Sequence, residues 1–230
     1  MTELARHFDA VLFDMDGVLV DSERQWDEVR SAYAAAHGRP WTSEDQLAVM
    51  GANSPQWSEA IRQRLGADVP AERIAAEVVA GVVARFRSGA VAVVPGAPEA
   101  VRRIAARYPV AIASSSPREV IAAALELLGL EGVFGATVSA DEVGLGKPAP
   151  DVYRLAARRL GADAERCLVI EDSTNGVLAG RAAGAFVVLV PSEAVAPAAA
   201  AFEAADLVVA HLRDVDPDRL WGSGSPRPAA

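Results

Sequence analysis

The sequence has little of what would place it in several special classes. Cysteine occurs once in 230 residues, which excludes a disulfide framework, and Cys167 opens the apolar run Cys-Leu-Val-Ile, where we expect a buried and inert thiol. No run approaches the roughly 18 apolar residues of a membrane span. The stretch before Phe8 lacks the apolar segment and cleavage site of a secretory signal. These absences predict a cytoplasmic protein without membrane contact.

Positive charge is also scarce. Lys and Arg number 22 against 31 Asp and Glu, which gives a net charge of −9. Because such a field repels anions, we expect no nucleic-acid partner, and a phosphate-bearing ligand must be held by a local site. Lysine itself occurs once, at Lys147. Compositional bias alone explains this exception; the functional alternative is that the position needs a compact ammonium that a planar guanidinium cannot replace.

The pattern of apolar runs predicts an α/β fold. Apolar residues make up 51% of the sequence, so a chain of this length can bury a full core, as one domain or as a core with an insert. Short apolar runs alternate with helical patterns, several of which end at glycine, and this predicts a three-layer Rossmann-like parallel sheet covered by helices on both faces. The expected strands are 8–13, 110–113, 168–170, 186–190 and 207–209, and the expected helices are 97–108, 117–128, 151–160 and 176–183.

The stretch 23–89 breaks this alternation. It has no strand-like run, and Trp26, Val29, Tyr33 and Ala36 follow helical spacing. Helix starts are indicated at Thr42-Ser43-Glu44-Asp45, at a capping Ser54 before Pro55, and at Pro70, after which Ile74, Val78, Val82 and Phe86 share one side. We therefore predict a helical cap over 23–89, inserted into a catalytic core formed by 1–22 and 90–230. Residues 194–205 should form a surface helix, and 222–230 a flexible tail.

Acidic residues follow two of the expected strands. Asp14-Met15-Asp16-Gly17 comes after the first, and Glu171-Asp172 closes the strand at 168–170. In a parallel sheet these carboxylates emerge at the same edge, where a hard divalent cation such as Mg²⁺ would collect them. Taken singly, the first motif also fits an ordinary Asx or glycine turn and the second fits a helix cap. Their convergence favours the metal site.

Two further motifs offer anion ligands. Ser114-Ser115-Ser116 ends a strand and begins a helix, so its hydroxyls and free amides suit a phosphate, although serines at such positions also serve simply as caps. Lys147 lies in Gly-Lys-Pro-Ala-Pro-Asp, whose prolines keep its backbone extended; a solvated surface lysine is the alternative. Together the motifs supply a carboxylate nucleophile, a metal, anion donors and a mobile cation, which phosphoryl transfer requires.

This set of motifs resembles the haloacid dehalogenase-like superfamily. The run Asp14-Met-Asp-Gly-Val-Leu-Val-Asp-Ser22 is similar to its first signature almost letter for letter, and Ser114, Lys147 and Glu171-Asp172-Ser173 match the other three in order. The helical insert after the first signature resembles the subfamily of β-phosphoglucomutase, phosphoglycolate phosphatase and small sugar phosphatases. The resemblance spans roughly residues 8–209.

The resemblance implies a role for each matching residue. Asp14 would attack phosphorus, and Asp16 would protonate the leaving oxygen and then activate water. Ser114, Ser115 and Lys147 would hold the phosphate. Mg²⁺ would be held by Asp14, Asp16 through its carbonyl, Asp172, and Glu171 directly or through water. Dehalogenation itself is disfavoured, because that reaction has no use for an acid at Asp16.

Three functions compete at this stage. The leading function is a phosphatase of a small phosphorylated metabolite, such as a sugar phosphate, with the protein as a monomer or homodimer. A β-phosphoglucomutase-like phosphomutase is the alternative, disfavoured because Trp26 stands where those mutases carry a gating histidine and because residues 51–57 offer no cation for a second phosphate. A non-catalytic binding protein would have no need of the complete set of motifs.

Overall fold

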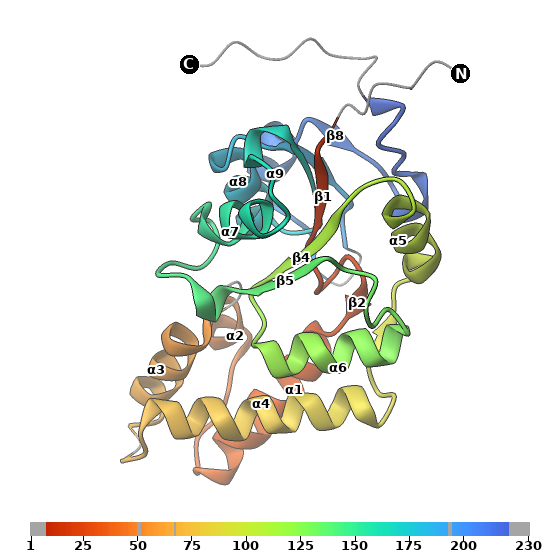
Figure 1. Ribbon diagram of the computed structural model, residues 1–230. Helices are drawn as coiled ribbons and strands as arrows, with labels where there is room; N and C mark the ends of the chain where they lie inside the picture. The colour runs from red at the N-terminus through yellow and green to blue at the C-terminus, as the bar shows by residue number, and fades with distance from the viewer. Residues whose placement is uncertain (1–7, 50–51, 67, 193–194, 221–230) are drawn as a thin grey trace, which may run out of the picture.

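A six-stranded sheet forms the centre of the molecule. The computed structural model describes residues 8–49, 52–66, 68–192 and 195–220. In that part of the chain the strands run in the order β5-β4-β1-β6-β7-β8, and every neighbouring pair is parallel (Figure 1). Their bounds are β1 Ala10–Phe13, β4 Val110–Ser114, β5 Ala136–Ser139, β6 Cys167–Glu171, β7 Phe186–Leu189 and β8 Leu207–Val208. The predicted fold class is confirmed.

Helices cover both faces of this sheet. Along β1, Val11 and Phe13 pack into one hydrophobic cluster, and Ala10 and Leu12 pack into another on the opposite side. The first face is covered by α5 (Ala97–Ala105) and α6 (Arg118–Leu128), and the second by α7 (Asp151–Arg159), α8 (Thr174–Ala182) and α9 (Ala199–Ala204). Burial on both faces explains why the strands are continuous apolar runs. Cys167 is fully buried, as expected.

The structure departs from the sequence-based expectations at several elements. Strand β5 was not predicted, because this edge strand exposes Thr137 and reads as Ala-Thr-Val-Ser. The helix expected over 194–205 is limited to Ala199–Ala204 among the described residues. Short 3₁₀ segments occur at η1 (Ala140–Glu142), η2 (Ala164–Arg166) and η3 (Leu212–Asp214). The predicted tail at 222–230 lies outside the described residues.

Along the chain, four helices lie between β1 and the next strand of the six-stranded sheet. They are α1 (Glu23–Ala36), α2 (Ser43–Val49), α3 (Ser54–Leu65) and α4 (Ala71–Arg87), and they gather at one end of the sheet (Figure 1). The chain enters through β2 (Val20–Asp21) and returns through β3 (Ala92–Val93), which pair antiparallel. The predicted apolar side of α4 is fully buried. The cap of α3 lies one residue earlier than predicted, at Asn53, which forms a reciprocal capping box with Gln56.

The four helices share contacts with the core. Helix α4 packs along α6, and one hydrophobic cluster continues from the α5/α6 face of the sheet into α1, α3 and α4. A polar contact joins the two parts near the strand ends, where the Ser54 amide at the start of α3 donates to Asp141 Oδ1 of η1 at 2.7 Å. Among the described helices, none is long and apolar enough to cross a membrane.

Candidate active site

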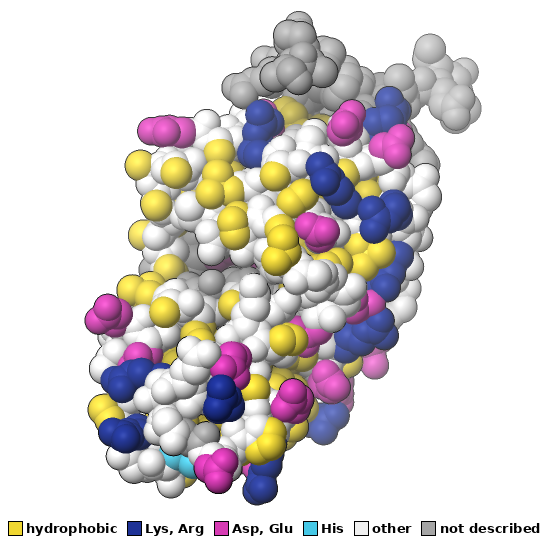
Figure 2. Space-filling model, turned by 90° about the vertical axis from the view of Figure 1, so that its left-hand side faces the viewer, with side chains coloured by type: hydrophobic (Ala, Val, Ile, Leu, Met, Phe, Trp, Pro, Cys, Tyr) yellow, Lys and Arg dark blue, Asp and Glu magenta, His cyan; other side chains and the backbone are white. Residues whose placement is uncertain are grey.

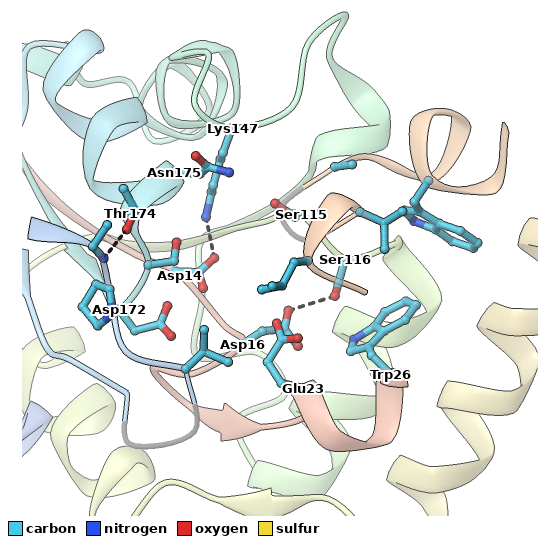
Figure 3. A pocket seen from close by; sticks show the side chains of 18 of the residues that line it. Asp14, Asp16, Glu23, Trp26, Ser115, Ser116, Lys147, Asp172, Thr174 and Asn175 are labelled. Carbon is cyan, nitrogen blue, oxygen red and sulfur yellow. Dashed lines mark hydrogen bonds and ion pairs between the residues drawn. The ribbon is translucent and has the colours of Figure 1, made fainter. Parts of the chain in front are cut away.

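Three neighbouring strands deliver the predicted residues to one edge of the sheet. Strand β1 lies between β4 and β6 in the sheet. Strand β1 ends at Phe13, β4 at Ser114 and β6 at Glu171. The chain continues from β1 to α5 on one face of the sheet and from β6 to α8 on the other, so a topological switch point lies between these two strands, where open α/β sheets bind ligands. Asp14 and Asp172 follow directly after β1 and β6. The side chains of Asp14, Lys147 and Asp172 converge there (Figure 3).

Lys147 is a buried ammonium shared by two carboxylates. Its Nζ lies 2.5 Å from Asp14 Oδ1 and 2.7 Å from Glu171 Oε1, and its side chain is 3% exposed. It also lies 5.0 Å from the centre of the Tyr153 ring. Burial alone would lower the pKa of Lys147, but the fields of Asp14 and Glu171 outweigh it and raise that pKa. The only lysine of the chain is therefore a charged group beside Asp14, and the alternative of a solvated surface lysine is wrong.

Hydrogen-bond donors of the protein saturate the Glu171 carboxylate. Besides Lys147, its Oε1 accepts from the Tyr153 hydroxyl at 2.6 Å. Its Oε2 accepts from the Asp172 and Ser173 amides at 3.0 and 3.1 Å and from Ser173 Oγ at 3.0 Å. Five donors occupy the roughly four lone-pair sites of one carboxylate. Although burial acts to raise the pKa of Glu171, Lys147 and these hydrogen bonds hold it below its usual value. Glu171 is thus placed to orient Lys147.

The carboxylates fit a divalent cation. Asp14, Glu171 and Asp172 are all buried, and one oxygen from each lies within 4.8 Å of the others. For these three carboxylates there is a single ammonium, which pairs with two of them, and burial raises the pKa of Asp14 to about 8 although Lys147 opposes it. Burial likewise raises the pKa of Asp172. These shifts mean that the buried negative charge is under-compensated, and a hard cation would supply what is missing. Because Glu171 is already filled, Asp14 and Asp172 are the residues with capacity to hold it.

Two glycines allow the carboxylates to approach the chain. A Cβ at Gly17, where φ is +85°, would stand 1.9 Å from Asp172 Oδ2. A Cβ at Gly176, in the first turn of α8, would stand 1.7 Å from Glu171 Oε1. Real side-chain atoms cannot approach that closely, so any larger residue would displace the carboxylate.

Asp16 points to a different part of the site. Its carboxylate accepts hydrogen bonds from Ser22 and from Ser114 Oγ at 3.2 Å. It also accepts from Ser116 Oγ at 2.8 Å (Figure 3). It is not among the three clustered metal-ligand candidates; the sequence-based expectation placed only its carbonyl on the metal. Ser114 is fully buried and its Oγ also accepts from the Ser116 amide, whereas Ser115 and Ser116 line the cavity. The phosphate-binding role of Ser114 stays a prediction.

A cavity of about 310 Å³ opens above these residues. Its floor contains Asp14, Asp16, Lys147 and Asp172, and its other wall comes from the helical insert through Glu23, Trp26, Arg30, Val49 and Trp57. Trp26 is 5% exposed and lies edge-on to Trp57, with ring centres 6.1 Å apart, so it is a core residue and a wall residue together. Burial raises the pKa of Glu23 to about 7. The insert therefore supplies much of the surface that a substrate would meet.

Sequence reasoning missed three residues of this region: Glu23, Arg30 and Tyr153. The buried residues of α1 are Gln25, Trp26, Arg30 and Ala34. Of the predicted positions, Trp26 is buried, Val29 and Tyr33 are half-buried against the core, and Ala36 is exposed. An arginine four residues after a buried tryptophan was an available signal for Arg30. Nothing in the sequence singles out Tyr153.

Comparison with known proteins agrees with this geometry. A family model described as haloacid dehalogenase-like hydrolase matches residues 8–184. A bifunctional riboflavin kinase/FMN phosphatase from Arabidopsis thaliana is 31% identical over 92% of this chain, which spans only 55% of that relative. The fructose-1-phosphate phosphatase YqaB of Escherichia coli K12 is 35% identical over 76% of this chain and 92% of its own length. A crystal structure of CbbY from Rhodobacter sphaeroides with phosphate superposes with a TM-score of 0.76 at 26% identity, covering 90% of this chain and 96% of that one.

Proposed function

The chain belongs to the haloacid dehalogenase-like hydrolases and is a phosphatase of that family, and we propose that it hydrolyses a small phosphorylated metabolite, such as a sugar phosphate, through an aspartyl-phosphate on Asp14. The observation that carries this proposal is the pairing of Asp14 with Lys147 at the floor of a cavity large enough for a small metabolite. A carboxylate held beside a buried ammonium can face an anionic phosphate that it would otherwise repel.

The first half of the reaction transfers the phosphoryl group. A carboxylate oxygen of Asp14 forms a bond to phosphorus while the bond to the ester oxygen breaks, and that oxygen takes a proton from Asp16. The Lys147 ammonium and the hydrogen-bond donors of Ser115 and Ser116 hold the phosphate oxygens. These three residues line the same cavity. Glu171 acts through Lys147 by fixing its position.

The second half releases phosphate. Asp16, now deprotonated, removes a proton from water, whose oxygen attacks phosphorus and frees Asp14 as inorganic phosphate leaves. The three seryl hydroxyls around Asp16 keep its carboxylate directed away from Lys147 and near the alcohol end of the substrate. We assign the metal to Asp14 and Asp172, with the Asp16 carbonyl as a further ligand and Glu171 outside the direct contacts. Mg²⁺ bound there would neutralise phosphate charge and polarise phosphorus.

We assign the helical insert the role of a cap. It supplies the cavity wall opposite the carboxylates, and the hydrogen bond from the Ser54 amide to Asp141 joins it to the core at η1. Closure would exclude bulk water and order the substrate. The protein is proposed to act in the cytoplasm, as a monomer or homodimer.

The test of this function is release of inorganic phosphate. Wild-type protein should hydrolyse p-nitrophenyl phosphate with Mg²⁺, lose that activity with EDTA, and regain it when Mg²⁺ is restored. A panel of phosphorylated sugars and glycolytic acids would then identify the preferred substrate. The Asp14→Asn protein is the matched control for contaminating phosphatases. Equal rates for wild type and this control would refute the proposal.

A further inference from the structure

The helical insert buries a cation that no carboxylate pairs with. Arg30, on the cavity-facing side of α1, is 6% exposed. Among the described residues no carboxylate lies within ion-pairing distance of Arg30; Glu23, which lines the same cavity, acts on it only through its electrostatic field.

 The guanidinium is thus held in the wall of the cavity as a positive charge that nearby carboxylates compensate only in part.

Its neighbours are aromatic and amide groups. The guanidinium carbon lies 4.7 Å from the ring centre of Trp26 and 5.4 Å from that of Trp57, so two indoles hold it in place. One nitrogen, Nη1, donates to Gln46 Oε1 at 3.1 Å, and the same oxygen accepts from Trp41 Nε1 at 3.3 Å. These contacts orient the arginine without neutralising its charge.

One donor of this cluster has no acceptor. Arg30 Nε is buried and has no hydrogen-bond partner within the part of the chain that the structure describes. An unmet buried donor costs free energy, and a buried unpaired charge costs more. Burial lowers the pKa of Arg30 to about 10, while the fields of Glu23, Asp27 and Asp16 act against that shift, so the group remains charged at neutral pH. A cation kept at this cost in a cavity wall suits an anion that arrives from outside.

The arrangement separates two anion sites. In Figure 3, Trp26 lies beyond Asp16 and Ser116 as seen from Asp14 and Lys147. Arg30 stacks on that tryptophan, so it stands on the insert side of the cavity, whereas Lys147 stands on the sheet side. A phosphate engaged by Lys147 would leave the rest of the substrate directed toward Arg30.

We propose that Arg30 binds a second acidic group of the substrate, a carboxylate or a second phosphate, at the end opposite the phosphate that is cleaved. This inference rests on the proposed phosphatase function, because it takes the Asp14 end of the cavity as the site of the reaction. It narrows the substrate class from phosphate esters in general to small molecules with two acidic ends. The planar guanidinium can hold either group through two parallel hydrogen bonds.

The test compares matched substrates. Glycerol 3-phosphate and 3-phosphoglycerate differ by a carboxylate, and glucose 6-phosphate and glucose 1,6-bisphosphate differ by a phosphate. Wild type should prefer the diacidic member of at least one pair in kcat/KM, and Arg30→Met should reduce that preference by about 10- to 100-fold, as for loss of a hydrogen bond to a charged group. The ratio within a pair cancels any general loss of folded enzyme. Which pair responds identifies a carboxylate or a phosphate.

A binding measurement keeps the two proposals apart. The Asp14→Asn protein should bind the diacidic member more tightly, with a change in the fluorescence of Trp26 and Trp57, and adding Arg30→Met should remove that advantage. The matched control is Arg24→Met, which replaces an exposed arginine of the same helix. Arg24 pairs with Glu28, and its replacement should leave the preference intact. Absence of Mg²⁺-dependent hydrolysis alone would refute only the phosphatase function. An equal preference in wild type and Arg30→Met, in turnover and in binding, would overturn the role of Arg30.

Discussion

Asp14 is the residue on which the proposed chemistry depends most directly. Asp14→Asn keeps the size of the side chain, but an amide cannot form the aspartyl-phosphate, so turnover should fall by at least about 10³-fold. The measurement is kcat on p-nitrophenyl phosphate, with circular dichroism to confirm the fold. Substantial activity in a correctly folded variant would move the nucleophile to another residue.

Asp16 should show a smaller and different loss. Replacement by asparagine removes the proposed proton donor and base, and general acid–base assistance is typically worth about 10²–10⁴-fold. Because phosphoryl transfer from an activated ester needs little protonation of the leaving group, the phosphoenzyme should accumulate in this variant. Mass spectrometry after rapid acid quenching would detect it. Unchanged kinetics would remove Asp16 from the reaction.

Lys147 tests whether charge alone suffices. Lys147→Arg preserves the charge, but the ammonium is 3% exposed and lies 2.5 Å from Asp14 and 2.7 Å from Glu171, which leaves no space for a planar fork. We expect kcat to fall about 10²-fold, the usual cost of losing one preorganised charge donor. Lys147→Met provides the uncharged comparison, and thermal unfolding separates lost packing from lost chemistry. Wild-type activity in the arginine variant would make the single lysine an accident of composition.

At this scale the sequence predicted the charged centre better than its surroundings. Asp14, Lys147, Glu171 and Asp172 were found because each follows a strand or precedes a helix in a recognisable motif, and the structure brings all four together. Tyr153 was not found, since its contact with Glu171 depends on how α7 packs on the sheet. Such side-chain contacts arise from tertiary packing and leave no local pattern in the sequence.

At the scale of elements, the first turn of α8 couples helix geometry to the site. Gly176→Ala should favour the helix by up to about 1 kcal/mol through propensity alone. The added methyl group would nevertheless stand 1.7 Å from Glu171 Oε1, so that carboxylate must move and Lys147 must follow. We expect the affinity for Mg²⁺ to fall about 10- to 100-fold, as when other residues that orient metal ligands are replaced, and turnover to fall with it.

Titration of activity with Mg²⁺ measures this effect. Gly144→Ala is the control, because a Cβ there meets nothing within 4 Å. If Gly176→Ala bound Mg²⁺ like wild type, the Glu171 carboxylate would not be a positioning group for the site.

The elements themselves were predictable where burial dominates. Strands β1, β4, β6 and β7 are buried, so each appears as an apolar run. The two-residue strands β2 and β3 carry no such signal; they pair because the chain leaves and re-enters the core side by side. Short pairings of this kind depend on contacts distant in sequence, which periodicity does not report.

At the scale of the whole molecule, the cavity wall bears on the choice between water and a sugar hydroxyl. A mutase must protect its phosphoenzyme from water, and the position expected for a gating histidine is Trp26, which is buried and cannot exchange a proton near neutral pH. Residues 52–57 add no cation, although Arg30 provides one from α1. We therefore expect inorganic phosphate from hexose phosphates and little conversion of β-glucose 1-phosphate to glucose 6-phosphate, even with bisphosphate primer.

A coupled assay for glucose 6-phosphate, run beside phosphate release, decides between these outcomes. Isomerisation that outruns hydrolysis would make the phosphomutase the correct function. On the face shown in Figure 2, basic and acidic side chains are interspersed.

The pairing of β2 with β3 has a consequence for how this molecule can diversify. Val20 lies opposite Val93 and Asp21 opposite Ala92, so the chain departs and returns about one strand spacing apart, roughly 4.8 Å. A different segment whose ends lie that close together could join the core at this point, provided that it also covers the apolar surface that α4 now covers on α6. The residues that would break the phosphate ester and those that would select its alcohol are therefore encoded in separate stretches of sequence. Selection can alter the second stretch while the reaction chemistry is inherited unchanged.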